Sequence, residues 1–314
     1  MSIPTLSVCI PTYNSSAYLA ETLDSLVSQF DDKDVFNWVE IVISDNASPD
    51  DTTSVVKRYQ ARYPNIKYTR NHINLWGAVN IIKVTEWASA KHLWLLTDND
   101  SSSKFALWYV LRIIEETNFD VMLWNFLIST PEKLLKFHEE FKGYHKFNGI
   151  WELGDFFGNQ IDMPLHSFGS NFSLYSIFFV KKEYFDFSRN TLDKKRLSTH
   201  FFPHSLITYA NIEDKIIIKP NNIFTLPMWH PSSWSHSANL YNHFHEVFLS
   251  FMYSKKITPK FMKKIRRFLI WYWIINYTMI IIDPFPFVWN TLKALMKKSN
   301  LFKKLINSVL NPDI

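Results

Sequence analysis

Two aspartates separated by one residue, Asp98 and Asp100, directly follow an apolar run at residues 92–96. Carboxylates at this spacing can hold a divalent cation, Mn²⁺ or Mg²⁺, and such a cation can bridge the oxygens of a diphosphate. The same pattern is also common in helix caps and solvated turns. Whether these aspartates form a cation site or only a cap or turn therefore depends on the other polar clusters of the chain.

Two further polar clusters follow apolar, β-rich runs in the same way. Pro11-Thr12-Tyr13-Asn14 follows the run at residues 6–10, and Ser44-Asp45-Asn46 follows the run at residues 39–43. Asp45 could accept hydrogen bonds from a nucleobase, and Tyr13 could stack on a base or a ribose. The alternative is that Tyr13 and Asn14 only shape a turn.

Alternating strand and helix signals surround these clusters over the first 130 residues. Strands are predicted at residues 6–10, 39–43, 66–68, 92–96 and 120–128. Helices are predicted between them, starting at Ser15 or Ser16, at Asp50 or Asp51, at Gly77 and near Lys104. This alternation predicts an α/β fold with a mostly parallel central sheet and helices on both faces. Because ligands bind beyond the carboxyl ends of such strands, the three clusters should form one site.

Glycine is scarce where a phosphate-binding loop would need it. The chain has six glycines, and Gly77 is the only one in its first 142 residues. The sequence therefore contains neither a G-x-G-x-x-G turn nor a G-x-x-x-x-G-K-[ST] loop. A bound nucleotide would have to be held by other means, such as carboxylates and a cation.

Four short motifs occur in order along the first 100 residues. They are Pro11-Thr12-Tyr13-Asn14, Ser44-Asp45-Asn46-Ala47-Ser48 with Asp50-Asp51, Asn74 with Gly77 and Asn80, and Thr97-Asp98-Asn99-Asp100. Together they resemble the signature of family 2 glycosyltransferases with the A-type fold, and the resemblance covers residues 5–130. The second and fourth motifs are most similar to abequosyltransferase-like members, which build surface polysaccharides such as the O-antigen of lipopolysaccharide.

The resemblance implies an inverting, metal-dependent transferase that moves one sugar from a nucleotide-sugar donor to a hydroxyl of a glycan. It implies that Asp98 and Asp100 serve the metal, and that His230 lies in a loop that closes over the diphosphate or ligates the same metal. The donor site implied by the resemblance consists of Pro11, Thr12, Tyr13, Asn14, Asp45, Asn46, Asn74, Gly77, Asn80, Asp98 and Asn99.

Inversion needs a general base near the acceptor hydroxyl. In the family this base is usually an Asp of a Glu-Asp pair, about a dozen residues before the last strand of the acceptor half. Here the corresponding stretch, before a predicted strand at 216–218, reads HFFPH and departs from the pattern. His204 is the preferred candidate because an imidazole titrates near neutral pH. Asp193 is the second candidate, and Asp186 and the Glu213-Asp214 pair remain alternatives.

Composition divides the chain into three regions. Residues 1–130 form the predicted nucleotide-sugar-binding half of one domain, and residues 131–254 form its acceptor-binding half. Residues 255–314 form a predicted helical extension, rich in aromatic residues, with 12 Lys and Arg against two Asp. Its uncharged run at 268–282 is shorter than the roughly 20 residues of a membrane-spanning helix. We therefore expect the extension to lie on an anionic membrane surface, with a packed helical cap as the alternative.

The expected location follows from the N-terminus, the cysteine content and the basic extension. No signal-peptide pattern starts the chain, and the single Cys9 allows no internal disulfide. We expect a cytoplasmic protein, held peripherally at the inner face of the cell membrane, whose acceptor is carried on a lipid diphosphate. Nucleic acid is not an expected partner, because no binding module accompanies the positive charge.

Two other functions remain open. One is a catalytically silent carbohydrate-binding or scaffold protein with the same fold, which the unusual base region would permit. The other is a sugar-phosphate nucleotidyltransferase, which also uses an α/β sheet and acidic metal ligands. The second is disfavoured because such an enzyme normally has a glycine-rich, basic loop after its first strand, and this chain has none there.

Overall fold

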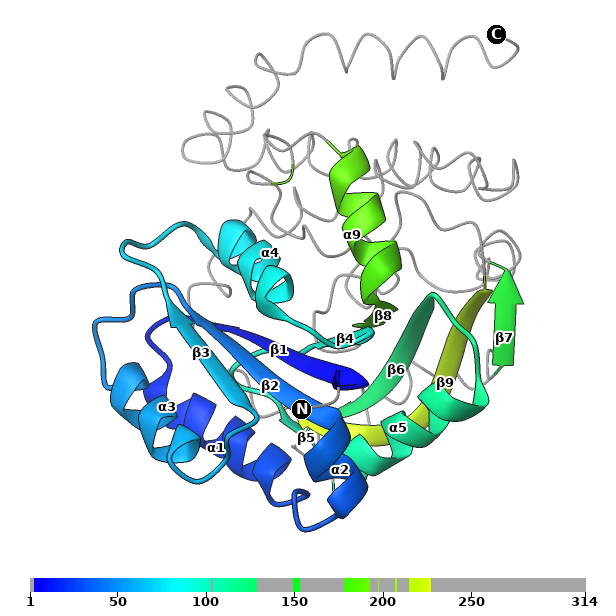
Figure 1. Cartoon of the computed structure of the whole chain (residues 1–314), viewed down its shortest axis with the longest axis horizontal. Helices are drawn as coiled ribbons and strands as arrows, with labels where there is room; N and C mark the ends of the chain where they lie inside the picture. The colour runs from blue at the N-terminus through cyan, green and yellow to red at the C-terminus, as the bar shows by residue number, and fades with distance from the viewer. Residues whose placement is uncertain are drawn as a thin grey trace, which may run out of the picture.

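The structure, a computed structural model, describes residues 3–102, 104–128, 149–152, 178–192, 197, 207 and 215–226. Within these residues a nine-stranded sheet forms the centre, and helices pack on both of its faces (Figure 1). The prediction of an α/β fold with a mostly parallel central sheet is confirmed. The predicted helical extension at 255–314 lies outside the described residues, and the division into regions stays a prediction.

The N-terminal half of the sheet is parallel. Its strands are β1 (Leu6–Thr12), β2 (Val39–Asp45), β3 (Ile66–Arg70) and β4 (His92–Leu95), in the spatial order β3-β2-β1-β4. Thr12 and Asp45, the last residues of β1 and β2, lie opposite each other, and Cys9 lies opposite Leu95, the last residue of β4. This register brings the segments that follow β1, β2 and β4 to one edge, which we call the carboxyl edge.

The other half of the sheet is mixed. Its strands are β5 (Ser101–Ser102), β6 (Val121–Ile128), β7 (Gly149–Glu152), β8 (Phe178–Lys181) and β9 (Lys215–Leu226). β8 is antiparallel to both β4 and β6, while β6 and β9 are parallel. β5 and β7 pair with β9 in antiparallel orientation. The predicted strand at 216–218 is confirmed as part of β9.

Helices cover both faces of the sheet. They are α1 (Ser16–Val27), α2 (Lys33–Trp38), α3 (Thr52–Gln60), α4 (Gly77–Trp87), α5 (Ala106–Glu116) and α9 (Lys182–Thr191). Figure 1 shows α1, α2, α3 and α5 on one side of the sheet and α4 and α9 on the other. Among the described residues, no helix combines the length and apolar content needed to cross a bilayer.

The central strands are rich in apolar residues and are buried, because helices exclude water from both faces of the sheet. All seven residues of β2 are buried. Trp94 of β4 stacks on Phe179 of β8, with ring centroids 4.9 Å apart and an interplanar angle of 20°, and both side chains are fully buried. This aromatic pair joins the parallel half of the sheet to its first antiparallel strand.

Helix α2 was not predicted, because six residues are too few to show a helical period. Its start is set by Asp32, whose carboxylate accepts hydrogen bonds from the N–H groups of Asp34 (2.9 Å) and Val35 (3.0 Å). The predicted starts of α1, α3 and α4 agree with the structure to within a residue. The Asp50 carboxylate accepts hydrogen bonds from the N–H groups of Thr52 (3.1 Å) and Ser16 (2.9 Å). It therefore connects the start of α3 to the start of α1.

Candidate functional site

The carboxyl edge brings the first, second and fourth of the four sequence motifs together. Thr12 Oγ1 donates a hydrogen bond of 2.7 Å to Asp98 Oδ2. The N–H of Asn46 donates to the carbonyl oxygen of Thr12 at 2.9 Å. Because Thr12 ends β1, it connects the loop that follows β4 with the loop that follows β2.

Asp98 lies in an environment that disfavours its charged form. Burial raises the pKa of this carboxyl to about 6, although the Thr12 and Ser15 hydroxyls and the Tyr13 N–H donate hydrogen bonds that act in the opposite direction. A desolvated carboxylate is stabilised by a nearby positive charge. The Asp98 side chain is therefore suited to sharing its charge with a cation.

The residues present fit a divalent cation that is completed by a substrate. Asp98 and Asp100 are separated by one residue in a loop at the carboxyl edge, and Asp100 is buried. In the described part of the chain, no group of three or more His, Cys, Asp and Glu side chains could hold a metal on its own. Mg²⁺ commonly takes one or two carboxylates and fills its remaining positions with water and phosphate oxygens. His230, the predicted third ligand, lies outside the described residues.

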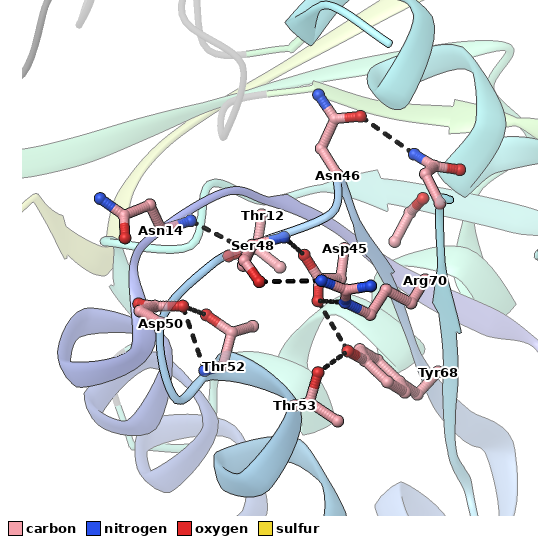
Figure 2. A network of polar contacts seen from close by, with 12 residues as sticks. Thr12, Asn14, Asp45, Asn46, Ser48, Asp50, Thr52, Thr53, Tyr68 and Arg70 are labelled. Atoms are coloured by element: carbon pink, nitrogen blue, oxygen red, sulfur yellow. Dashed lines mark hydrogen bonds and ion pairs between the residues drawn. The ribbon is translucent and has the colours of Figure 1, made fainter. Parts of the chain in front are cut away.

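Asp45 organises the loop after β2. Its side chain is fully buried and accepts from the Ser48 N–H (2.8 Å) and the Tyr68 hydroxyl (2.7 Å), and it forms an ion pair with Arg70 Nε (3.4 Å). Burial, together with the bond to Asp45, raises the pKa of Tyr68 to about 12, so this hydroxyl remains a proton donor. Figure 2 shows these groups converging on the Asp45 carboxylate.

Tyr13 and Asn14 lie on the neighbouring loop, which is bound to the Asp45 loop. The N–H of Asn14 donates to Ser48 Oγ at 2.9 Å (Figure 2). Asn14 adopts a φ of 53°, a left-handed conformation that asparagine tolerates better than most residues. The Tyr13 side chain is 48% exposed, so its ring is accessible for stacking. Tyr13 can therefore combine a backbone role toward Asp98 with a side-chain role toward a ligand.

An amide network supports the carboxyl edge from behind. Asn80 of α4 accepts from Ser44 Oγ (2.7 Å) and donates to the Ser44 carbonyl (2.8 Å). Asn71 donates to both Asn80 (3.0 Å) and Asn46 (3.1 Å). Asn46 in turn donates to Asn74 at 2.8 Å. Three of the predicted site residues, Asn46, Asn74 and Asn80, thus belong to one hydrogen-bonded unit.

Three residues that support predicted site residues were not themselves predicted: Tyr68, Arg70 and Asn71. Tyr68 lies within β3, Arg70 ends it and Asn71 follows it, and β3 is the parallel neighbour of β2. The signal was present, because polar residues also follow the other three parallel strands at their carboxyl ends. It was missed because the third strand was predicted to end at residue 68, two residues too early.

The predicted catalytic bases are not tested by the structure. His204, Asp193 and the Glu213-Asp214 pair lie outside the described residues. Asp186 lies in α9, where its carboxylate forms ion pairs with Lys182 (2.5 Å) and Arg189 (3.3 Å). His204 and Asp193 therefore remain predictions, and Asp186 is engaged with two cationic side chains of its own helix.

Known proteins resemble this chain in sequence and in fold. Residues 7–180, more than half of the chain, match the family model described as glycosyl transferase family 2. The chain belongs to this family. The abequosyltransferase RfbV of Salmonella typhimurium is 30% identical over 188 residues, which cover 58% of this chain and 54% of that protein. An uncharacterized glycosyltransferase of Mycoplasma genitalium is 27% identical over 57% of each chain. The match thus spans about half the length of these family 2 relatives.

Solved structures support the A-type fold of this family 2 member. The Staphylococcus aureus protein TarS, residues 1–349 in complex with UDP-GlcNAc, superposes with a TM-score of 0.59 at 15% identity and covers 84% of this chain and 71% of that one. The mannosyltransferase PcManGT of Pyrobaculum calidifontis, in complex with GDP-Man and Mn²⁺, gives a TM-score of 0.56 at 13% identity and covers 99% and 82%. At such low identity these likenesses establish the fold alone.

Proposed function

We propose that this protein is an inverting glycosyltransferase that moves a single sugar from a nucleotide-sugar donor to a hydroxyl of a lipid-linked or surface glycan. The observation that carries the proposal is the contact of Thr12 with Asp98, because it joins two of the family motifs at the carboxyl edge of a parallel sheet. Ligands of such sheets bind at this edge. Among the relatives, RfbV is named as an abequosyltransferase, and a 28% identical Campylobacter jejuni protein is named as a glucosyltransferase acting on an undecaprenol-linked glycan.

In this proposal the nucleotide lies across the loops that follow β1 and β2. The exposed ring of Tyr13 stacks on the base or the ribose, and Asp45 accepts a hydrogen bond from the base edge. The buried Asp45 already has three partners, so it also fixes the shape of the loop that receives the base. The other proposed donor-site residues are Pro11, Thr12, Asn14, Asn46, Asn74, Gly77, Asn80, Asp98 and Asn99.

Asp98 and Asp100 would hold a divalent cation, Mn²⁺ or Mg²⁺, together with the diphosphate of the donor. When bound, such a cation stabilises the negative charge that develops on the leaving nucleoside diphosphate. Thr12 keeps the Asp98 carboxylate in position through its hydroxyl. His230 is the proposed additional ligand or loop residue on the diphosphate side.

Transfer with inversion proceeds by a single displacement. The acceptor hydroxyl oxygen attacks the anomeric carbon, the bond from that carbon to the diphosphate oxygen breaks, and the hydroxyl proton passes to a general base. We propose His204 as this base, with Asp193 as the second candidate. The basic extension at 255–314 would hold the enzyme peripherally on the anionic cytoplasmic face of the cell membrane, where a lipid-linked acceptor is within reach.

The experiment that tests the donor site is a thermal-shift screen of UDP, CDP, GDP and dTDP, each with and without Mn²⁺. A ligand that binds the folded state raises its stability, by about 2.7 kcal/mol at a concentration of 100 times Kd. We expect one nucleotide to stabilise the protein in a Mn²⁺-dependent way, and Asp100→Asn to remove that dependence. Asp31→Asn, which changes an exposed aspartate between α1 and α2, is the control.

Two outcomes would contradict the proposal. If Asp100→Asn keeps the full Mn²⁺-dependent shift, the metal assignment is wrong. If no nucleotide stabilises the wild-type protein, the catalytically silent carbohydrate-binding protein becomes the better description. Mn²⁺-dependent hydrolysis of a nucleotide sugar separates an enzyme from such a binder, because a silent protein shows none.

A further inference from the structure

The loop between β3 and α4 ends in an exposed tryptophan with an unusual backbone. The Trp76 side chain is 81% exposed, the largest value among the exposed large apolar residues of the described chain. Its backbone has φ 70° and ψ 148°, a region that is essentially reserved for glycine. A bulky residue there is a genuine outlier, and such strain persists only where the surroundings impose it. An exposed indole and a strained backbone at one position together call for a functional reason.

The surroundings that impose this conformation belong to the carboxyl edge. Asn74 Oδ1 accepts from the Trp76 N–H (3.1 Å) and also from Asn46 Nδ2 (2.8 Å). Asn46 Oδ1 accepts from the Leu75 N–H at 2.9 Å. The Asn46 N–H is itself bound to the carbonyl of Thr12, whose hydroxyl contacts Asp98. A continuous path of hydrogen bonds therefore fixes Trp76 relative to the proposed metal-binding carboxylate.

We propose that Trp76 is a stacking platform for one saccharide ring at the rim of the donor site, an inference that rests on the proposed function. The flat apolar face of an indole matches the C–H face of a pyranose, and stacking removes both from water. The surface beside it is open, since no atom of the other described residues lies within 4 Å of the position of a Cβ on Gly77, apart from the adjacent residues and the backbone of α4. The ring can come from the donor sugar or from the acceptor glycan, and the experiment distinguishes these sources.

A membrane contact is the competing use of an exposed tryptophan, because Ile73 on the same loop is 66% exposed. The loop at residues 71–76 contains no Lys or Arg, which anionic lipid would attract. Its shape is also fixed by two hydrogen bonds to Asn46 of the site and by one within the loop, from the Trp76 N–H to Asn74. These observations favour a saccharide over a lipid headgroup.

The first arm measures donor binding by titration calorimetry in the presence of Mn²⁺. The probes are the four nucleoside diphosphates and their common sugar derivatives, including UDP-glucose, UDP-GlcNAc and GDP-mannose. If the donor sugar stacks on Trp76, Trp76→Ala weakens the nucleotide sugar about tenfold, the size expected of one aromatic stack. The bare nucleotide then keeps its Kd, and Trp76→Phe restores most of the loss. Trp87→Ala is the control, since Trp87 is 56% exposed at the other end of α4.

The second arm uses a glycan array probed with the same full-length variants. If the acceptor ring stacks on Trp76, binding to the recognised glycans is lost in Trp76→Ala and retained in Trp76→Phe and Trp87→Ala. Identical saccharide binding by wild type and Trp76→Ala in both arms overturns the inference, and so does the absence of saccharide binding by wild type in both. A wild type that binds glycans but no nucleotide contradicts the proposed function while leaving this inference standing.

A third measurement separates recognition from packing. Trp76→Gly removes the backbone strain, so we expect its Tm to equal or exceed that of wild type while saccharide binding falls as in Trp76→Ala. A lower Tm together with weaker binding would show that Trp76 packs the loop, and would overturn the inference. Trp76→Ala that instead loses binding to phosphatidylglycerol vesicles, with saccharide binding unchanged, would assign the residue to the membrane.

Discussion

Asp98 shows how two effects act in opposite directions on one carboxyl group. Burial raises its pKa to about 6, whereas donors from Thr12, Ser15 and Tyr13 favour the ionised form. The donors fix the direction of the carboxylate, and burial leaves its charge incompletely compensated. A single residue can thus be both well positioned and ready to accept a cation.

The burial of His92 should make the stability of the fold depend on pH. Burial lowers the pKa of His92 from 6.5 to about 4, and its Nδ1 has no hydrogen-bond partner among the residues that the structure describes. Because the unfolded chain binds the proton at higher pH than the folded chain, stability should fall as pH drops from 6.5 toward 4, by up to about 3 kcal/mol. Urea unfolding of wild type, His92→Phe and His92→Gln at several pH values measures this slope. Both variants should show a smaller slope, and equal slopes would contradict the assignment.

The loops after β2 and β3 behave as one element because asparagine side chains connect them. Asn80 is 2% exposed and joins the start of α4 to Ser44, while its neighbour Asn71 extends the network to Asn46. Lys83, one turn further along α4, donates to Asn71 at 2.8 Å. The geometry of the carboxyl edge therefore depends on a helix that lies behind it.

Removal of the Asn80 amide tests this connection. Asn80→Ala removes the acceptor of the Ser44 hydroxyl, the donor to the Ser44 carbonyl and one of the two acceptors of the Asn71 amide. We therefore expect a loss of about 1–3 kcal/mol in the free energy of unfolding. The affinity for the nucleotide should also fall, since the Asp45 loop loses its support. Asn118→Ala, at an exposed asparagine, should change stability by less than about 0.5 kcal/mol. Equal stability of Asn80→Ala and wild type would refute the structural role.

In the whole molecule, the carboxyl edge of the sheet and the opposite edge carry different groups of polar residues. The carboxyl edge holds the candidate site, and the opposite edge holds a buried cluster around Glu40. Its carboxylate contacts Ser7, Lys67 and Ser89 from three separate segments. Burial alone would raise the pKa of Glu40, but these partners lower it overall. This cluster fixes the strands at one edge, while the loops at the other edge stay available for ligands.

The basic extension is tested in the full-length protein. If residues 255–314 contact anionic lipid, Lys263→Glu/Lys264→Glu should weaken binding to phosphatidylglycerol vesicles by about tenfold or more, since each basic residue near the surface contributes about 1 kcal/mol. Lys57→Glu/Arg58→Glu, at exposed positions of α3, makes the same charge change elsewhere and should bind like wild type. Co-sedimentation measures both. Equal binding by the two variants would favour the packed helical cap.

Local sequence patterns were sufficient to predict the parallel half of the fold and the positions of its motifs. Apolar runs and helix periods are local signals, so β1, β2, β4 and the helices α1, α3 and α4 could be predicted from neighbouring residues. The motifs at their ends followed from the same reasoning, because parallel strands place their carboxyl ends at one edge. The antiparallel strand β8 between β4 and β6 could not be predicted, because its partner residues are more than 50 positions away.

Which polar side chains contact one another depends on the packing of segments that are far apart in the sequence. Thr12 and Asp98 are 86 residues apart, and no local pattern specifies their hydrogen bond. The same is true of the amide network, in which Asn80 and Asn46 bind loops rather than solvent. The backbone conformation of Trp76 could not be predicted either, since Asn46, in the loop after β2, holds the adjacent Leu75 N–H. The chemical type of a side chain is known from the sequence alone. The hydrogen-bond partners that orient it depend on the packing of distant segments.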